Sequence, residues 1–193
     1  KFPMLTEPDE TYHGIRYTER FGNAAYITKA RVHLMRDLGC QASPFNAFLL
    51  NLGLETLPLR MERHTSNALA VAQFLEKHPK IKWVNYPGLP SSKYYSLVQK
   101  YMPEGTCGVV SFGIEGGRAA AAKFMAGLQM ASIVTHVADL RTCVLHPAST
   151  THRQMSDEQL VEAGVSPDLV RFSVGLEYID DILDDLKRAL DAV

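Results

Sequence analysis

The stretch LVRFSVGLEYIDDILDDLKRAL, residues 169–190, joins a short alternating segment to an amphipathic one. Successive side chains of a strand point to opposite faces, so Val170, Phe172 and Val174 share one apolar face. Arg171 points to the other face. The segment therefore predicts a strand with one buried face and a charged side chain on the face opposite to it.

The second half of the same stretch predicts a helix that covers the apolar face of the strand. Its apolar side chains recur at steps of three and four and form one stripe: Ile179, Ile182, Leu183, Leu186 and Leu190. Four aspartates lie off this stripe, and we expect them on the surface: Asp180, Asp181, Asp184 and Asp185. Arg171 is then directed away from the helix, where it either pairs with a carboxylate of a neighbouring strand in water or holds a ligand.

The composition is typical of a globular protein. The chain has 193 residues, of which 46% are hydrophobic and 21% charged, enough to bury a core in one or two domains. The net charge is -1 and the basic residues are scattered, which argues against nucleic acid or a membrane surface as the partner. No apolar run reaches the roughly 18 residues of a membrane span. We expect a cytoplasmic protein whose three cysteines are reduced and mostly buried.

The first third of the sequence predicts helices separated by short breaks. Residues 1–22 lack a clear period and are expected to form an extended or looping entry. Capping residues, helical spacing and stop residues then delimit three helices. The first spans 23–38 and is ended by Gly39, and the second begins at Ser43 and Pro44 and is weakened or ended by Gly53. The third begins at Thr56 and stops at His78 and Pro79.

After Pro79 short strands alternate with helices. Strands are predicted at 81–86, 107–114, around 131–134, at 141–145 and at 169–174, and helices at 92–101, 115–128, 156–163 and after 176. The fold class is α/β, with an open sheet covered by helices on one side and the Arg171 side left to face another domain. A domain boundary is expected between residues 50 and 60.

Few residue patterns point to a reaction. The seven histidines show neither HExxH nor paired i, i+4 spacing, so no metal site is expected. Ser111 lies inside a predicted strand rather than on a nucleophile elbow, and the glycines of EGGRA, residues 115–119, are typical of a strand-turn-helix connection. The segment THVADLRTCVLHPASTTH, residues 135–152, carries more polar groups than a connector needs, and is either a site or an ordinary loop.

Four separated stretches carry a resemblance to a known family. They are LNLGLETLPLRMERHTSNALAVAQFLE, VNYPGLPS, LRTCVLHPASTTH and VRFSVGLEYIDDILDDL. In this order and spacing they resemble the pyridoxal-phosphate (PLP) enzymes of cysteine and methionine metabolism, the transsulfuration family of fold type I. The resemblance implies the C-terminal portion of such an enzyme: residues 1–55 as the end of the large PLP-binding domain with its crossing helices, and 56–193 as the small domain with an open, mostly antiparallel sheet.

The resemblance also implies an activity. The stretches YHGIRYTERFGNAAYITKARVHLMRDLG and HPASTTHRQMSDEQL look most like the O-acetylhomoserine sulfhydrylase branch, which forms homocysteine from O-acetylhomoserine and sulfide by γ-replacement. The γ-lyases and γ-synthases of the family have a shorter segment where residues 7–22 stand. A methionine γ-lyase or cystathionine γ-synthase type of enzyme, or a non-catalytic isolated domain, are the alternatives.

The family pattern assigns a role to Arg171. In R-x-S-V-G-x-E the arginine binds the α-carboxylate of the substrate, and a guanidinium fork suits a carboxylate. The loop before HPAS lies against cofactor and substrate, and its matching residues are Thr135, His136 and Val137. The sequence departs from the pattern there, with His136 where Ser or Asn is common and Ala138 where Gly is common.

The resemblance implies further partners that this chain does not supply. The Schiff-base lysine, the Asp at the pyridine nitrogen, the stacking Tyr and the phosphate-binding glycines of the family all lie upstream, and Lys29 does not match the lysine motif. We therefore expect PLP to be bound mainly by an N-terminal portion, no catalytic residue in this chain, and no activity of the chain alone. Because the chain starts at Lys1, we expect a piece of a longer enzyme. The family implies a homotetramer built from dimers.

Overall fold

The computed structural model describes residues 1–193, which form two compact units, Lys1–Leu54 and Glu55–Val193. The predicted boundary lies between residues 55 and 56. That the first unit ends a large cofactor-binding domain stays a prediction. No helix is long and apolar enough to cross a membrane.

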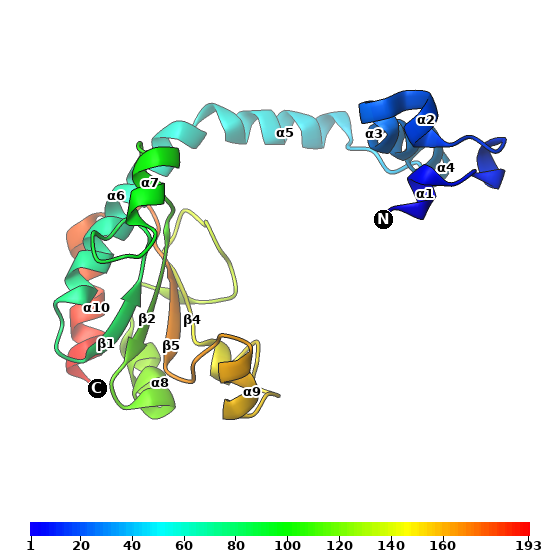
Figure 1. Ribbon diagram of the computed structural model, residues 1–193. Coiled ribbons are helices and arrows are strands. Elements are labelled where there is room, and N and C mark those ends of the chain that lie inside the picture. The colour runs from blue at the N-terminus through cyan, green and yellow to red at the C-terminus, as the bar shows by residue number, and fades with distance from the viewer. The chain divides into compact units, whose positions relative to one another are not determined.

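The first unit is helical (Figure 1). The expectation that residues 1–22 are an extended or looping entry is wrong, because short helices occupy much of this segment. Its elements are α1 (Pro3–Thr6), η1 (Glu10–Tyr12), α2 (Tyr17–Phe21), η2 (Gly22–Ala24), α3 (Ala25–Lys29), the π-helical η3 (Ala30–Met35), α4 (Arg36–Leu38) and α5 (Pro44–Glu55). The predicted helix 23–38 is confirmed as the run from η2 to α4, and Gly39 ends it in the left-handed region at φ 67°.

The start of α5 follows its sequence, but its end does not. Ser43 accepts the backbone N–H of Asn46 on its Oγ at 3.1 Å, as an N-cap does. Gly53 was expected to weaken or end this helix; it does not end it, because α5 continues to Glu55. A glycine lowers helix stability by about 1 kcal/mol relative to alanine, yet it can adopt helical angles when its neighbours do.

The second unit contains one sheet and the remaining helices. The helices are α6 (Leu57–Glu76), α7 (Tyr95–Tyr101), α8 (Gly117–Gly127), η4 (Pro147–Ser149), α9 (Asp157–Glu162) and α10 (Ile179–Asp191), and the strands are β1 (Ile81–Asn85), β2 (Val109–Ile114), β3 (Ser132–Ile133), β4 (Cys143–Leu145) and β5 (Leu169–Ser173). The strand order is β1-β2-β5-β4-β3, and only the β3–β4 pair is parallel. The predicted open, mostly antiparallel sheet is confirmed.

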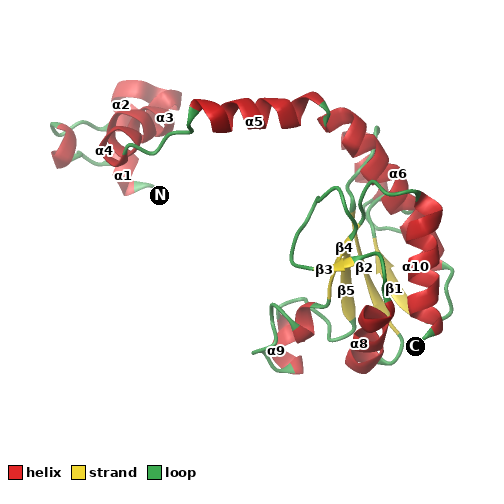
Figure 2. Cartoon of the chain, turned by 180° about the vertical axis from the view of Figure 1, so that it is seen from behind, coloured by secondary structure: helices red, strands yellow, loops and turns green.

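Helices α6, α8 and α10 lie on one side of this sheet (Figure 2). Val170, Phe172 and Val174 of the β5 segment are fully buried against them. Phe112 of β2 meets Phe124 of α8 edge to face, with ring centroids 5.7 Å apart. The buried cluster therefore occupies the space between the sheet and these three helices, as the apolar alternation of residues 169–174 predicts.

Two expectations about exposure need correction. The cysteines are not mostly buried: Cys40 is exposed in the segment between α4 and α5, Cys107 is half-buried and Cys143 is buried. Asp185 is not on the surface with Asp180, Asp181 and Asp184, because it is only 2% exposed. Its carboxylate accepts the backbone N–H groups of Gln129, Met130 and Ala131 at 2.8–3.1 Å, so it anchors the segment after α8 to α10.

We predict that Asp185→Asn lowers the free energy of unfolding by about 2 kcal/mol, because a neutral amide cannot replace a carboxylate that accepts three backbone N–H groups. The control is Asp184→Asn, which removes the same charge from the exposed neighbouring position and should change stability by less than about 0.5 kcal/mol. Urea unfolding followed by the fluorescence of Trp83, the one tryptophan of the chain, measures both variants. Equal effects of the two substitutions would contradict the anchoring role.

Candidate functional site

Arg171 lies in the middle of β5, with Ser111 of β2 and Leu145 of β4 directly opposite in register. Its side chain is on the face of the sheet that α6, α8 and α10 do not cover. The guanidinium Nη2 donates to the backbone carbonyl oxygens of Thr135 at 2.8 Å and His136 at 3.3 Å. The structure thus brings Arg171 to the predicted loop residues, and its partners are backbone carbonyls rather than a carboxylate of a neighbouring strand.

One buried donor of Arg171 is left without a partner. The Nε atom is buried and makes no hydrogen bond. A buried N–H group without an acceptor is unfavourable by about 1–3 kcal/mol, more for a charged group, so such a donor is usually satisfied by a ligand or water. A carboxylate matches the planar fork of a guanidinium in shape and in charge.

The loop that contacts Arg171 joins β3 to β4. Ala138 adopts φ 61°, a left-handed conformation that favours glycine and explains why glycine is common there in the family pattern. Its backbone N–H donates to Ser173 Oγ at 3.0 Å. The side chains of His136 and Val137 extend outward, His136 with 64% of its side chain exposed. These two residues therefore offer their side chains to whatever approaches Arg171.

The polar groups around His136 are not arranged as a proton-transfer pair. Nδ1 of His136 lies 3.7 Å from Oδ2 of Asp139, beyond hydrogen-bond distance. Donation by the backbone N–H of Arg141, followed by the positive charges of Arg141 and His136, lowers the pKa of Asp139. Asp139 is thus kept ionised by its own loop, and the structure gives His136 no assigned catalytic partner.

The HPAS segment contains a buried histidine. Nε2 of His146 lies 2.8 Å from the carbonyl oxygen of Pro167, to which it must donate, and Nδ1 then accepts from the hydroxyl of Ser149 at 2.7 Å. Burial lowers the pKa of His146. The imidazole connects η4 to the segment before β5, so this part of the polar stretch 135–152 is structural.

Two sequence interpretations of other polar residues hold. Ser111 lies within β2. Gly116 and Gly117 make a tight turn at φ 95° and 64° ahead of α8, while Arg118 donates to the carbonyl oxygen of Ala148 at 2.6 Å and pairs with Asp157. EGGRA is therefore a strand-turn-helix connection whose arginine is used within the fold.

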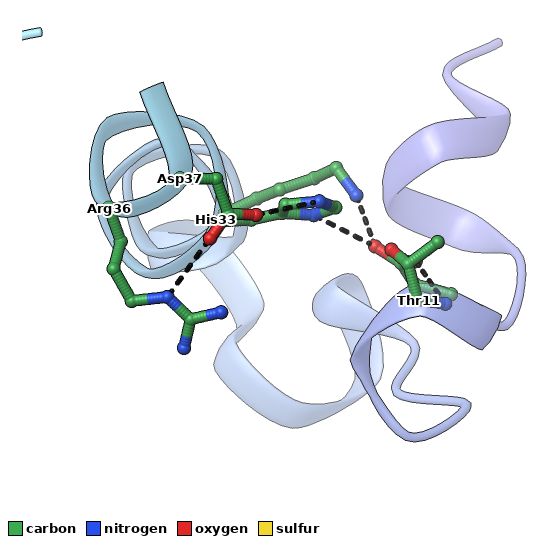
Figure 3. A network of polar contacts seen from close by, with 6 residues as sticks. Thr11, His33, Arg36 and Asp37 are labelled. Carbon is green, nitrogen blue, oxygen red and sulfur yellow. Dashed lines mark hydrogen bonds and ion pairs between the residues drawn. The ribbon is translucent and has the colours of Figure 1, made fainter. Parts of the chain in front are cut away.

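Lys29 belongs to a separate polar network in the first unit (Figure 3). Its Nζ pairs with Asp9 and lies 4.7 Å from the ring centroid of Tyr17. Hydrogen bonds from Lys29 and Thr11 lower the pKa of Asp9 to about 2. His33 bridges this cluster to Asp37, with 3.5 Å between Nε2 and Oδ2. An ammonium group held this way stabilises the helices around it, and we assign it no chemical role.

Sequence reasoning missed two residues that shape the Arg171 site. Thr142 and Glu177 hydrogen-bond to each other through two contacts of 2.6 and 2.9 Å and fix the far end of the loop. One indication of a role for Glu177 was present in the sequence: it is the glutamate of R-x-S-V-G-x-E, shortly after the predicted strand 169–174. Its partner is 35 residues away in sequence, and no local pattern connects them.

Arg171 is thus a cation held by a loop on the uncovered face of an α/β sheet. The model of the family "Cys/Met metabolism PLP-dependent enzyme" matches residues 20–191. The chain belongs to this family of PLP-dependent enzymes.

Known relatives match almost the whole chain. The O-acetyl-L-homoserine sulfhydrylase of Leptospira meyeri is 52% identical, with 98% of this chain and 45% of that protein covered. The homocysteine synthase of Schizosaccharomyces pombe is 49% identical, with 99% and 44% covered. A crystal structure from Campylobacter jejuni, described as an O-acetylhomoserine (thiol)-lyase with N'-pyridoxyl-lysine-5'-monophosphate, superposes with a TM-score of 0.85 at 38% identity over 98% of this chain and 45% of that chain. The chain thus spans about 45% of the length of these relatives. The expected fold type I class is confirmed.

The buried state of His146 leads to a pH dependence. Its pKa is lowered in the folded state, so below the ordinary value near 6.5 the unfolded chain binds a proton that the folded chain does not, and stability falls as the pH drops from 7.5 to 5.5. We predict that His146→Gln flattens this part of the pH profile while lowering stability overall. Urea unfolding at the two pH values tests it, with His152→Gln in the neighbouring surface loop as the control that keeps the original slope. An unchanged slope in His146→Gln would refute the assignment.

Proposed function

We propose that this chain is the C-terminal part of a PLP-dependent O-acetylhomoserine sulfhydrylase, a transferase that forms homocysteine from O-acetylhomoserine and sulfide by γ-replacement in methionine biosynthesis. The observation that carries the proposal is Arg171, held by the carbonyls of Thr135 and His136 with its Nε buried and unpaired. The names of the relatives, at 49–52% identity for the two described above, support the choice of reaction.

In this proposal the chain binds and orients the amino acid. Arg171 anchors the α-carboxylate, while Thr135, His136 and Val137 form the edge of the substrate site. The fork of Arg171 fits a carboxylate, and we assign no residue of this chain to the cofactor. When bound, PLP supplies the electron sink for the reaction.

The remaining parts of the enzyme are proposed from the family. An N-terminal portion would hold PLP and the Schiff-base lysine, residues 1–55 would end the large domain, and 56–193 would form the small domain. The assembly would be a cytoplasmic homotetramer made of two dimers, and the chain alone would be inactive. A methionine γ-lyase or cystathionine γ-synthase reaction is separated by assaying homocysteine formation from O-acetylhomoserine and sulfide against release of α-ketobutyrate.

We predict that Arg171→Met lowers kcat/KM for O-acetylhomoserine by about 10- to 150-fold in the full-length enzyme, because a charge-assisted contact to the carboxylate is lost. The variant should also lose most of the preference for O-acetylhomoserine over its carboxamide. Lys187→Met, which removes a positive charge from the exposed side of α10, is the matched control. An unchanged kcat/KM and an unchanged preference in Arg171→Met would refute the proposal.

A further inference from the structure

The loop between β3 and β4 is fixed at both of its ends. At the first end Arg171 binds the carbonyls of Thr135 and His136, and Ser173 accepts the N–H of Ala138. The loop residues between these contacts carry the exposed side chains of the proposed substrate site. The geometry of this loop therefore determines the direction in which the guanidinium of Arg171 points.

The second end is held by Glu177. Its Oε1 accepts the backbone N–H of Thr142 at 2.6 Å, and its Oε2 accepts the Thr142 hydroxyl at 2.9 Å. The same hydroxyl accepts the N–H of Gly175 at 2.9 Å, and Thr142 is fully buried. The carboxylate of Glu177 thus accepts from both donors of Thr142, the backbone N–H and the hydroxyl, and both of its oxygens are hydrogen-bonded.

The turn that carries Glu177 packs directly against the loop. The N–H of Leu176 donates to the carbonyl oxygen of Leu140 at 2.8 Å. A Cβ on Gly175 would lie 2.5 Å from the Thr142 nitrogen and 2.6 Å from the Arg141 carbonyl carbon, so only glycine allows this approach. The glycine and the glutamate of R-x-S-V-G-x-E therefore serve the same contact.

Helix α6 holds the turn from the other side. Nδ1 of His64 donates to the carbonyl oxygen of Val174 at 2.7 Å, and the Asn67 side chain donates to the carbonyls of Gly175 and Glu177 at 3.0 Å each. His64 and Asn67 are each only 3% exposed. A continuous set of buried contacts thus runs from α6 through the turn and Glu177 to the loop that orients Arg171.

We propose that Glu177 is a positioning residue of the substrate-carboxylate site. It acts through Thr142: by keeping the loop in one conformation before substrate arrives, it keeps the guanidinium of Arg171 oriented. An ordered loop avoids an entropy loss on binding, which favours affinity for the carboxylate. This inference rests on the proposed function for the identity of the ligand, whereas the clamp itself is tested without it.

The clamp is tested by amide hydrogen exchange on the full-length holoenzyme without substrate. In Glu177→Gln one donor of Thr142 loses its acceptor, because the amide brings a donor of its own, and we expect exchange in residues 135–142 to accelerate about tenfold. Thr142→Val, which lacks the hydroxyl, should show a similar acceleration of exchange. Thr142→Ser, which keeps both donors, should exchange at the rate of the parent enzyme. Glu162→Gln, at an exposed position of α9, is the charge-matched control. Unchanged exchange in Glu177→Gln and Thr142→Val would overturn the inference.

The positioning role is tested by kinetics in two backgrounds. We expect Glu177→Gln to raise KM for O-acetylhomoserine about tenfold, with a smaller change in kcat, and to weaken the preference for the carboxylate substrate over its carboxamide. In the Arg171→Met background Glu177→Gln should add nothing, since both substitutions remove the same interaction. If Glu177→Gln folds poorly, Glu177→Asp takes its place. Because this variant keeps the charge, its KM and its substrate preference should lie between those of the parent and those expected for Glu177→Gln.

The outcomes separate the two proposals. If Arg171→Met changes KM and substrate preference but Glu177→Gln and Glu177→Asp do not, the positioning inference alone fails. If Glu177→Gln has the same effect with and without Arg171, Glu177 acts through general stability and the inference also fails. If Arg171→Met itself leaves KM and preference unchanged, the proposed function fails, and the role of Glu177 in it fails too.

Discussion

The two-sided alternation of β5 is the constraint on which the second unit depends. Because side chains alternate, a five-residue strand can place Val170 and Phe172 in the core and Arg171 on the opposite face with no separate element for either task. Position in the sheet adds to this effect, since β5 is the third of five strands and has hydrogen-bonded neighbours on both sides. The backbone of a charged residue on such a strand is held in place by the sheet, so only the end of its side chain needs further contacts to be ordered.

The parts of the fold that sequence predicted are those encoded by neighbouring residues. The N-cap of Ser43 and the alternation around Arg171 both act within four residues, and each appears in the structure. The burial of Asp185 was missed because its three N–H partners lie more than 50 residues earlier, and a polar residue off the apolar stripe gives no sign of them. The position of Arg171 followed from the sequence. The pairing of Glu177 with Thr142 could not be predicted, because it joins residues far apart in sequence, as the contacts of Asp185 do.

The loop that meets Arg171 combines a strained residue with many fixed contacts. Ala138 at φ 61° is unfavourable for any side chain with a Cβ, by about 1–2 kcal/mol. Such a conformation persists only where surrounding contacts determine it, and here the contacts are the hydroxyl of Ser173, the guanidinium of Arg171 and the carboxylate of Glu177. The departure from glycine is thus tolerated because the loop is held from both ends.

In the proposed function Arg171 has two tasks that a lysine could not combine. One amino group of the guanidinium is occupied by two backbone carbonyls, which restricts rotation of the planar group, and the buried Nε on the same plane makes no hydrogen bond. A lysine ammonium has no such plane, so binding the loop would not define the direction of its remaining donors. In the proposed function the contacts to the loop contribute to recognition without touching the ligand, because they convert a flexible side chain into an oriented one.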